Sequence, residues 1–387
     1  MTQVSVAPCA DYSQTEVRRA LDETLKPFGG LDWVLPGMKI AIKANLVIFF
    51  NPSRAATTHP ALICELCRLL AERGAEVTLG DSPGGLYTPA FVNRVYAATG
   101  IREVEKYGGK LNSDFGQATA VYPDARAAKN FIYTSYLDRA DVIINFCKLK
   151  THGMMGMSAA VKNMFGVVPG TLKPEYHYRF PSNAVFADML VDLNEYFAPK
   201  TRLSICDAVV AMEGNGPTAG SPRKIGAILA SPSPYLLDLV ASGLIGLTRR
   251  DVPTLEAAYR RGLAPASADE VLVSGDPARF RVADFKQVAS PRSIEKFGGR
   301  VVGYFLGRLF RSRPVPDKAE CTGCGVCAGI CPAGVIDIRN KLAHINRKKC
   351  IGCFCCQEFC PTGAMKVERS ATARFLVKSD PVRKRKH

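Results

Sequence analysis

The sequence predicts an α/β fold over residues 1–290, built on a mainly parallel sheet with helices on both faces, followed by a small α+β domain near the C-terminus. Short apolar runs alternate with longer helical patterns through the first of these regions, which is typical of βα units in a parallel sheet. The second region is marked by a cysteine-rich segment that occurs twice. A length of 387 residues suits two or three domains, and 47% hydrophobic residues are ordinary for a globular protein.

Six apolar runs are the expected strands of the first domain. They are residues 38–43, 76–80, 141–146, 202–206, 224–230 and 270–275. Helical patterns occupy several of the intervals between them, as βα units require.

Residues 59–74 give the clearest helical pattern. Four leucines of this segment share one face, and Gly74 is a natural end for the helix. Cys64 and Cys67 lie in the same segment at a spacing that also occurs in metal sites. Because their neighbours are aliphatic and no second pair of cysteines lies nearby, we expect both to pack in the core.

The C-terminal region contains one cysteine motif twice. Residues 321–332 read CTGCGVCAGICP, and residues 350–361 read CIGCFCCQEFCP. A shift of 29 positions lays four cysteines of the first motif onto four of the second and carries a glycine and the final proline with them. The two motifs are therefore an internal repeat. Cys355 has no counterpart, and we expect it to be a small packing residue that points away from any bound metal.

Each motif has the spacing Cys-x2-Cys-x2-Cys-x3-Cys-Pro, which presents three thiolates to one iron–sulfur cube while the fourth reaches the other cube. This spacing predicts two 4Fe-4S clusters. The ligands of the first are Cys321, Cys324, Cys327 and Cys360. The ligands of the second are Cys350, Cys353, Cys356 and Cys331. The segment resembles the bacterial two-cluster ferredoxin. Zinc knots usually separate their Cys-x2-Cys pairs by a long spacer, and disulfides need an oxidising compartment that the N-terminal sequence does not indicate.

The chain is strongly basic, with a formal net charge of +16. Each cluster with four thiolates adds about two negative charges, which leaves the protein basic. This excess favours acidic protein partners, among them a redox partner, or anionic small molecules. No helix-turn-helix, zinc-finger or aromatic RNA-binding signature is present, which makes nucleic acid a poor candidate. No apolar stretch approaches the ~20 residues of a membrane-spanning helix, and we expect a soluble, cytoplasmic protein.

Residues 291–314 are the expected connector between the two domains. They mix aromatic and aliphatic residues with arginines in a basic amphipathic pattern, which also suits peripheral contact with an anionic membrane. Several glycines weaken this segment as an isolated helix, so we favour a connector that packs the domains together. Residues 315–370 are the expected two-cluster domain, and residues 371–387 are a basic tail.

Polar side chains collect where the expected strands end, which is where ligands bind in doubly wound sheets. The residues that we expect to bind a ligand or a further, unidentified cofactor there are Lys43, Asn45, Asp81, Lys148, Asn163, Asp207 and Glu213. The candidate catalytic residues are Lys150, His152 and Lys162. The lysines suit the anionic groups of a substrate, and the carboxylates and the histidine suit proton transfer.

Residues 147–170, CKLKTHGMMGMSAAVKNMFGVVPG, are the richest part of this set. An expected strand ends in two lysines and His152, passes through a Gly and Met loop, and enters a helix that carries Lys162 and Asn163. Free N–H groups at the start of such a helix suit a phosphate or a carboxylate. His152 has three readings that the sequence leaves open: a general acid, a metal ligand, or a structural hydrogen bond.

Residues 214–220, GNGPTAG, are similar to a dinucleotide-binding loop but run into the expected strand 224–230 instead of a helix, so a nicotinamide site is poorly supported. With the runs KLKTHGMMGMSAAVKNMFG, KANL, GDSPGG and DAVVAMEGNGP, the chain resembles a domain-of-unknown-function family of anaerobes that is often fused to a two-cluster ferredoxin. The resemblance implies the two-domain plan and the clusters but supplies no reaction. Ala44 stands where this family often has proline.

Three functions fit these observations. We favour an iron–sulfur oxidoreductase that passes electrons from the clusters to an anionic substrate or a further cofactor in the α/β domain. The first alternative is a non-catalytic electron carrier that docks on a partner redox enzyme. The second is a maturation protein that holds a metal through Asp81, His152, Asp207 and Glu213.

Overall fold

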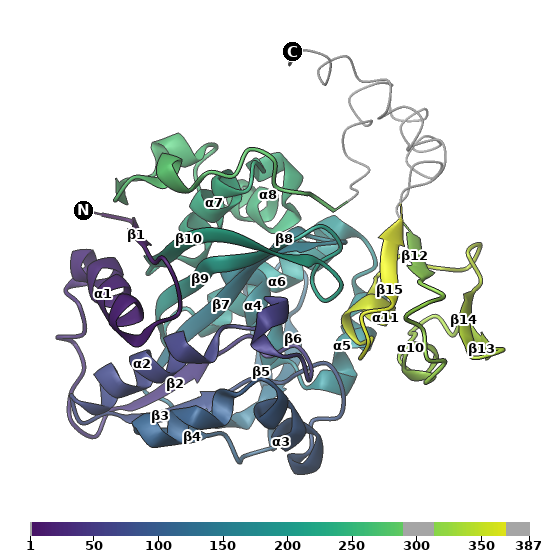
Figure 1. Cartoon of the computed structure of the whole chain (residues 1–387), viewed down its shortest axis with the longest axis horizontal. Helices are drawn as coiled ribbons and strands as arrows, with labels where there is room; N and C mark the ends of the chain where they lie inside the picture. Colours follow the sequence, from purple (N-terminus) through teal and green to yellow (C-terminus); the bar gives the residue numbers. More distant parts are fainter. Residues whose placement is uncertain (1, 289–312, 369–387) are drawn as a thin grey trace.

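The computed structural model describes residues 2–288 and 313–368. Residues 2–288 form a large α/β body, and residues 313–368 form a small C-terminal domain at one side of it (Figure 1). The expected connector up to residue 312 and the basic tail 371–387 lie outside the described residues, and so does the expected membrane contact of the connector.

One sheet of nine strands forms the centre of the body. Its order is β11 (Val273–Ser274), β1 (Val4–Pro8), β10 (Ser221–Ser231), β9 (Thr201–Glu213), β7 (Val142–His152), β2 (Lys39–Lys43), β3 (Glu76–Gly80) and β4 (Gly109–Leu111), with β8 (Gly156–Ser158) paired to β7. The run from β9 to β4 is parallel, whereas β10 is antiparallel to both of its neighbours. The mainly parallel sheet that the sequence predicts is confirmed.

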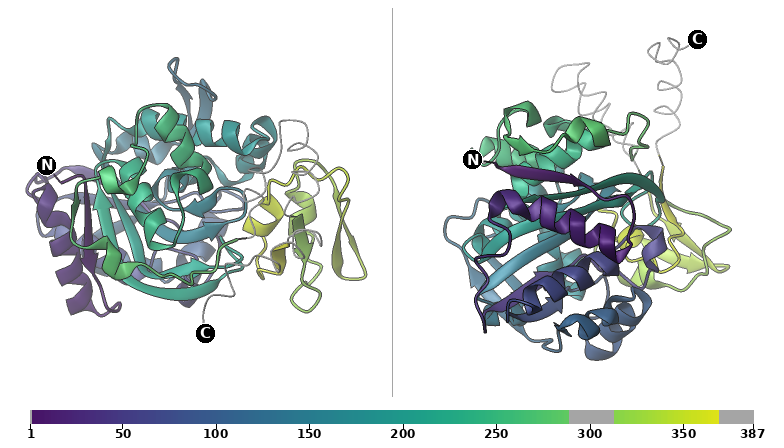
Figure 2. Two further views of the ribbon diagram at one scale, coloured as in Figure 1. Left: turned by 90° about the horizontal axis from the view of Figure 1, so that it is seen from above. Right: turned by 60° about the vertical axis from the view of Figure 1, so that its left-hand side comes forward.

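Helices cover both faces of the sheet (Figure 2). They are α1 (Gln14–Leu25), α2 (Pro60–Ala71), α3 (Pro89–Ala98), α4 (Ala160–Asn163), α5 (Lys173–Arg179), α6 (Asn183–Phe197), α7 (Pro234–Leu244) and α8 (Pro253–Arg260). Successive residues of β2 point to opposite faces: Ile40 and Ile42 pack with α1 to α3, while Ala41 packs with α6. The central strands are therefore buried on both sides, which explains why they read as continuous apolar runs.

Two central strands are longer than the sequence predicts. β7 continues to His152 rather than ending at residue 146, and β9 continues to Glu213 rather than ending at residue 206. Lys148 lies opposite Asp207 in the register between them, so each charge has a partner inside the ladder and the strands need not end there. The structure also contains β1 and an antiparallel hairpin of β5 (Gln117–Val121) and β6 (Asn130–Thr134), which the apolar runs did not predict.

The helix expected at 59–74 is α2, and its core packing is as predicted. Cys64 and Cys67 are 7% and 0% exposed and belong to the same hydrophobic cluster as the leucines of α2. Gly74 has a φ of +81°, a left-handed conformation that suits glycine after a helix. The strand expected at 270–275 is reduced to the two residues of β11.

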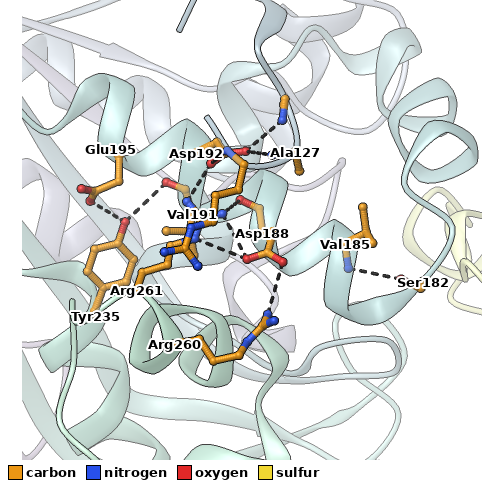
Figure 3. Close-up of polar contacts among 12 residues, drawn as sticks. Ala127, Ser182, Val185, Asp188, Val191, Asp192, Glu195, Tyr235, Arg260 and Arg261 are labelled. Atoms are coloured by element: carbon orange, nitrogen blue, oxygen red, sulfur yellow. Dashed lines mark hydrogen bonds and ion pairs between the residues drawn. The ribbon is translucent and has the colours of Figure 1, made fainter. Parts of the chain in front are cut away.

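A cluster of ion pairs ties α6 to α8 and to the segment before β6 (Figure 3). The buried Asp192 accepts hydrogen bonds from the backbone N–H groups of residues 126–128, at 2.7 to 3.0 Å, and from Arg261 at 2.7 Å. Arg261 also pairs with Asp188 at 3.1 Å. Each buried charge of this cluster has several partners. The cluster therefore holds α6, the end of α8 and residues 126–128 together, and we do not regard it as a reactive site.

Residues 313–368 of the C-terminal domain contain two small two-stranded antiparallel sheets and two short helices. β12 (Arg313–Pro316) pairs with β15 (Met365–Glu368), and β13 (Ile336–Arg339) pairs with β14 (Leu342–Ile345). The helices are α10 (Val326–Gly329) and α11 (Cys355–Glu358), one from each cysteine motif. α11 lies on the side facing the body, and the β13–β14 hairpin lies farthest from it (Figure 1). Within the described residues, no helix has the length and apolar character needed to span a membrane.

Candidate functional site

Two cavities of the C-terminal domain are walled by cysteines. The first is lined by Cys321, Cys324, Cys327 and Cys360. The second is lined by Cys331, Cys350, Cys353 and Cys356. Each cavity thus takes three cysteines from one motif and the fourth from the other, which is the grouping predicted for two 4Fe-4S clusters. The residues present fit such clusters, since the four cysteines predicted to hold each cluster line one cavity together.

Cys355 is buried, at 1% exposure, as expected for a packing residue. It nevertheless lines the second cavity together with the four predicted ligands. That it points away from a bound cluster stays a prediction.

A different cavity, of about 60 Å³, lies beyond the carboxyl ends of β2 and β3, and we call it the lysine cavity. Its polar walls include Asn45, Asp81, Ser82, Lys150, Lys162, Asn163 and Lys173. Glu358 and Phe359 of the C-terminal domain form part of the same wall. The cavity is therefore built from both domains.

Lys150 projects into this cavity from β7. Its ammonium donates hydrogen bonds to Asn45 Oδ1 at 2.6 Å and to the backbone oxygen of Ala56 at 2.7 Å. Burial, followed by the neighbouring charge of Lys162, lowers the pKa of Lys150 from 10.5 to about 7. Lys150 is therefore close to half-protonated near neutral pH, which suits a group that gives up and takes up a proton.

Lys43 and Asp81 form a buried ion pair beside the cavity, with Nζ and Oδ1 at 2.8 Å. Lys43 also donates to Asn163 Oδ1 at 3.1 Å, and Asp81 accepts from the backbone N–H of Leu46 at 2.8 Å. Burial lowers the pKa of Lys43, and Asp81 partly offsets this. The pair joins the last residue of β2 to the first residue after β3, beside the cavity.

Lys173, from α5, is a second cavity lysine with a perturbed pKa. It donates to the backbone oxygens of Ser82 and Val168, both at 2.6 Å. Burial lowers its pKa from 10.5 to about 7. The hydroxyl of Ser82, which lines the cavity and is 1% exposed, has no hydrogen-bond partner among residues 2–288 and 313–368.

His152 links the two domains rather than lining the cavity. Its Nδ1 accepts hydrogen bonds from the backbone N–H groups of Met154 and Met155, at 3.1 and 3.2 Å. The ring proton therefore lies on Nε2, which donates to Glu358 Oε1 at 2.6 Å. Burial lowers the pKa of His152 to about 4, so the ring is neutral at neutral pH. Of the three readings of this residue, the geometry favours the hydrogen bond.

The loop 214–220, which joins β9 to β10, contacts the C-terminal domain through several hydrogen bonds. Gln357 Nε2 donates to the backbone oxygens of Asn215 and Gly216 at 2.9 and 3.2 Å. The hydroxyl of Thr218 donates to the backbone oxygen of Gln357 at 2.8 Å, and Val367 N–H donates to Asn215 Oδ1 at 3.2 Å. The glycine-rich loop, whose sequence is similar to a dinucleotide-binding loop, thus forms hydrogen bonds with α11.

Two family models match the chain. One, described as a domain of unknown function (DUF362), matches residues 40–243, which is more than half of the chain. The chain belongs to the DUF362 family. The other, described as a 4Fe-4S dicluster domain, matches residues 313–361 and identifies the C-terminal domain as ferredoxin-type, which supports iron–sulfur electron transfer.

Two relatives share sequence with this DUF362 chain. The thylakoid-associated protein sll1697 of Synechocystis sp. is 33% identical over 290 residues, which cover 73% of this chain and 87% of that protein. The uncharacterized ferredoxin MJ0155 of Methanocaldococcus jannaschii is 52% identical over 31 residues, 8% of this chain and 20% of that protein.

Two solved structures show a distant likeness. The lactate racemase apoprotein from Thermoanaerobacterium thermosaccharolyticum has a TM-score of 0.38 and 13% identity, covering 60% of this chain and 54% of that one. A protein from Thermotoga maritima has a TM-score of 0.32 and 14% identity, covering 52% and 51%. The DUF362 chain thus spans about half the length of each of these two solved structures.

The Lys-Asn-Met-Phe-Gly run of this DUF362 chain, residues 162–166, lies at the cavity. Lys162 reaches Glu358 at 3.3 Å, and Asn163 bonds to the side chains of residues 43, 45 and 145. A Cβ on Gly166 would lie 2.2 Å from Asp81 Oδ1, so only glycine fits beside the ion pair of Asp81. Each of these residues thus has a physical reason for its identity.

The prediction of an anion-binding site at the start of α4 is wrong. The helix has four residues, and its N–H groups at Ala160 and Val161 are bound by the carboxylate of Asp238, at 2.7 and 3.1 Å. An acidic side chain from α7 therefore occupies the position that a ligand would need. The lysines, not the helix start, supply the positive charge of the site.

Lys148 and Asp207 belong to a separate buried network. Their ion pair of 2.8 Å is closed by Tyr12, whose hydroxyl bonds to both residues at 3.0 Å, and Tyr12 stacks on His59 with ring centroids 3.6 Å apart. Neither Lys148 nor Asp207 lines the lysine cavity. Their contacts join the segment before α1 to the sheet.

Glu213 also lies away from the lysine cavity. Its carboxylate accepts a hydrogen bond from the backbone N–H of Lys286 at 3.0 Å. The four residues of the metal hypothesis are therefore dispersed, and in the described parts of the chain no three His, Cys, Asp or Glu side chains come together to hold a single metal ion.

Sequence reasoning missed two residues that line the lysine cavity, Lys173 and Glu358, and also His177, which contacts Phe165 of the cavity wall. His177 is 1% exposed, stacks on Phe186 at 4.3 Å and meets the edge of Phe165 at 5.6 Å, and neither ring nitrogen has a partner among the residues that the structure describes. Burial lowers its pKa to about 3. One signal was present in the sequence: Lys173 and His177 are four residues apart and share a helix face.

Proposed function

We propose that this protein is an iron–sulfur oxidoreductase whose C-terminal domain passes electrons from two 4Fe-4S clusters to a small anionic substrate in the lysine cavity. One observation carries the proposal. Glu358 and Phe359 lie between Cys356 and Cys360, which are predicted ligands of different clusters, and both line the same cavity as Lys150, Lys162 and Lys173. A substrate in this cavity would lie next to the segment that joins the two clusters.

The charges around the cavity support an anionic ligand. Four amines, those of Lys43, Lys150, Lys162 and Lys173, lie at or beside it, against the two carboxylates of Asp81 and Glu358. Buried charges are costly unless they are paired. Burial is the main cause of the lowered pKa values of Lys150 and Lys173, with neighbouring lysines adding to it, and a bound anion would favour the charged form of both amines.

The chemistry is a reduction with balanced electrons and protons. When bound, the two clusters would supply two electrons drawn from an external one-electron donor, and the substrate would take them up together with two protons. Lys150 and Lys173 are the candidate proton donors because their pKa values lie near 7. Lys162 holds the anionic group. His152, which is neutral and bonded to Glu358, is a positioning residue in this scheme.

The test is anaerobic. Protein reduced with dithionite and freed of excess reductant is mixed with a panel of small anions, and reoxidation of the clusters is followed by visible absorption. We expect at least one anion to reoxidise the clusters, and we expect the Lys150→Ala/Lys162→Ala double variant to lose most of that rate. Lys110→Ala, at an exposed position of β4, is the matched control. An unchanged rate in the double variant would refute the assigned site.

The net charge of +16 favours a second candidate, a non-catalytic carrier that docks on an acidic redox protein. Electrostatic association of this kind weakens steeply with salt. If the carrier role is correct, the rate of electron transfer to a partner protein falls as ionic strength rises, while no small molecule is consumed.

A further inference from the structure

The polar lining of the lysine cavity consists mainly of hydrogen-bond donors. An ammonium group has three N–H donors. Lys150 and Lys173 each use two of them within the described residues, and Lys162 uses one, toward Glu358. The buried hydroxyl of Ser82 adds a further donor without a partner in the same part of the chain. The ligand that completes this site must therefore accept several hydrogen bonds at once.

The two carboxylates of the cavity are already engaged. Asp81 pairs with Lys43 and accepts from the backbone N–H of Leu46, and Glu358 accepts from His152 and Lys162. A ligand that offers donors, such as an amine or a sugar, would compete with these contacts. An oxyanion would not, because it brings only acceptors.

The size of the cavity limits the ligand as well. A volume of about 60 Å³ corresponds to roughly four to six water-sized groups. Phe165 and Phe359 close part of the wall with apolar surface. A short carboxylate or a tetrahedral oxyanion fits this space, whereas the base and ribose of a nucleotide would have to extend beyond it.

We infer that the lysine cavity binds a small oxyanion, a short monocarboxylate or a tetrahedral anion, through Lys162, Lys173 and the hydroxyl of Ser82. The inference rests on the proposed function only in taking this cavity as the substrate site, and it names the class of substrate. It also connects the ligand to the predicted cluster ligands through side-chain contacts. Lys162 lines the cavity and contacts Glu358, and Glu358 lies two residues from Cys356 and from Cys360.

A bound anion should therefore affect the clusters. Reduction adds a negative charge to a cluster, and cluster potentials depend on nearby charge and on hydrogen bonding. An anion held by Lys162 draws that ammonium away from Glu358 and adds its own charge. We expect the reduction potential of at least one cluster to become more negative when the site is filled.

The experiment uses the anaerobically purified full chain with its clusters in place. Isothermal titration calorimetry is run with acetate and with sulfate, with acetamide as the uncharged isostere of acetate and AMP as a bulky anion. We expect acetate or sulfate to bind, acetamide not to bind, and AMP to bind more weakly than the preferred small anion. Acetate and sulfate distinguish the planar from the tetrahedral class.

The variants assign the contacts. We expect Lys162→Met and Lys173→Met each to weaken binding about tenfold or more, and Ser82→Ala to weaken it several-fold. Lys110→Met, on the exposed side of β4, should bind as the unaltered chain does. Circular dichroism and iron content check that each variant is folded and loaded. If a lysine variant fails to fold, Ser82→Ala and the potential shift on adding the anion still decide the assignment.

The two proposals fail in different ways. If a small anion binds and shifts the reduction potential but no anion reoxidises the clusters, the result supports the oxyanion site and refutes the oxidoreductase function. If a bulky acceptor reoxidises the clusters while neither acetate nor sulfate binds, the oxyanion inference is overturned and the redox function survives. Equal binding of acetate and acetamide also overturns it.

Discussion

His152 of the body and Glu358 of the C-terminal domain are joined by a hydrogen bond of 2.6 Å between Nε2 and Oε1. His152 is completely buried, whereas the side chain of Glu358 is 13% exposed. This bond fixes α11 against the end of β7 and holds Glu358 at the wall of the lysine cavity. The contact therefore helps to fix the position of the C-terminal domain relative to the lysine cavity.

Replacing His152 with alanine should loosen this contact. The buried partner loses a charge-assisted hydrogen bond, so we expect the free energy of unfolding to fall by about 1 to 3 kcal/mol. Hydrogen exchange of residues 355–359 should become faster, and electron transfer from the clusters to the cavity should slow more than anion affinity changes. His344→Ala, at an exposed position of β14, is the control. Protected amides at 355–359 in the His152 variant would contradict the coupling.

The crossed arrangement of the cysteines gives a prediction of its own. Cys331 lies in the first motif by sequence but lines the second cavity with Cys350, Cys353 and Cys356. Cys331→Ser should therefore disturb the cluster of the second motif and leave the first with all four of its ligands. Iron and sulfide analysis, together with the paramagnetic resonance of the reduced protein, should show about half the cluster content. Cys355→Ser should retain both clusters, and loss of a cluster in that variant would assign Cys355 as a ligand.

The fold was largely predictable because its dominant signals are local. Alternating apolar runs and helical patterns identified β2, β3 and α2 within a residue or a few of their observed bounds, and the repeated cysteine spacing identified the small domain. Strand ends were less predictable. The sequence shows Lys148 as a charge that should end a strand, and only the tertiary structure shows Asp207 beside it.

The site was predictable in part for the same reason. Lys150, Lys162, Asn45 and Asp81 follow or flank recognisable elements, and the structure brings them together. Glu358 was not predictable. Nothing in the local sequence indicates that a residue between two cysteines will contact Lys162, which lies almost two hundred positions earlier in the chain. Asp238 was missed likewise, since its two hydrogen bonds to the start of α4 depend on how α7 packs.

Gly166 should not tolerate a side chain. A Cβ there would lie 2.2 Å from Asp81 Oδ1 and 2.4 Å from Lys43 Nζ, so Gly166→Ala must push this ion pair apart. Separating a buried pair leaves uncompensated charge, and we expect the free energy of unfolding to drop by about 3 to 5 kcal/mol. Denaturant unfolding under anaerobic conditions measures this. Gly243→Ala in α7, where the added Cβ meets nothing within 4 Å, should be neutral or slightly stabilising.

Anion binding in the lysine cavity should depend on pH in a defined direction. Burial lowers the pKa of both Lys150 and Lys173 to about 7 in the free protein. A bound anion favours the charged amines and raises both values, so binding takes up protons between the free and the bound pKa values. The affinity is therefore highest below about pH 7 and falls above it, by up to about tenfold per pH unit for each proton taken up.

Calorimetry with the preferred probe, acetate or sulfate, from about pH 6 to about pH 9 measures this slope. Neither probe titrates in that interval, so the change in affinity reports the protein alone. Lys173→Met removes one of the two amines, and its slope should be close to half that of the unaltered chain, while Lys110→Met should leave the slope unchanged. An affinity that is constant or rises with pH would show that a bound anion does not raise the pKa values of Lys150 and Lys173, and it would contradict the assignment of Lys173 as a contact of the anion.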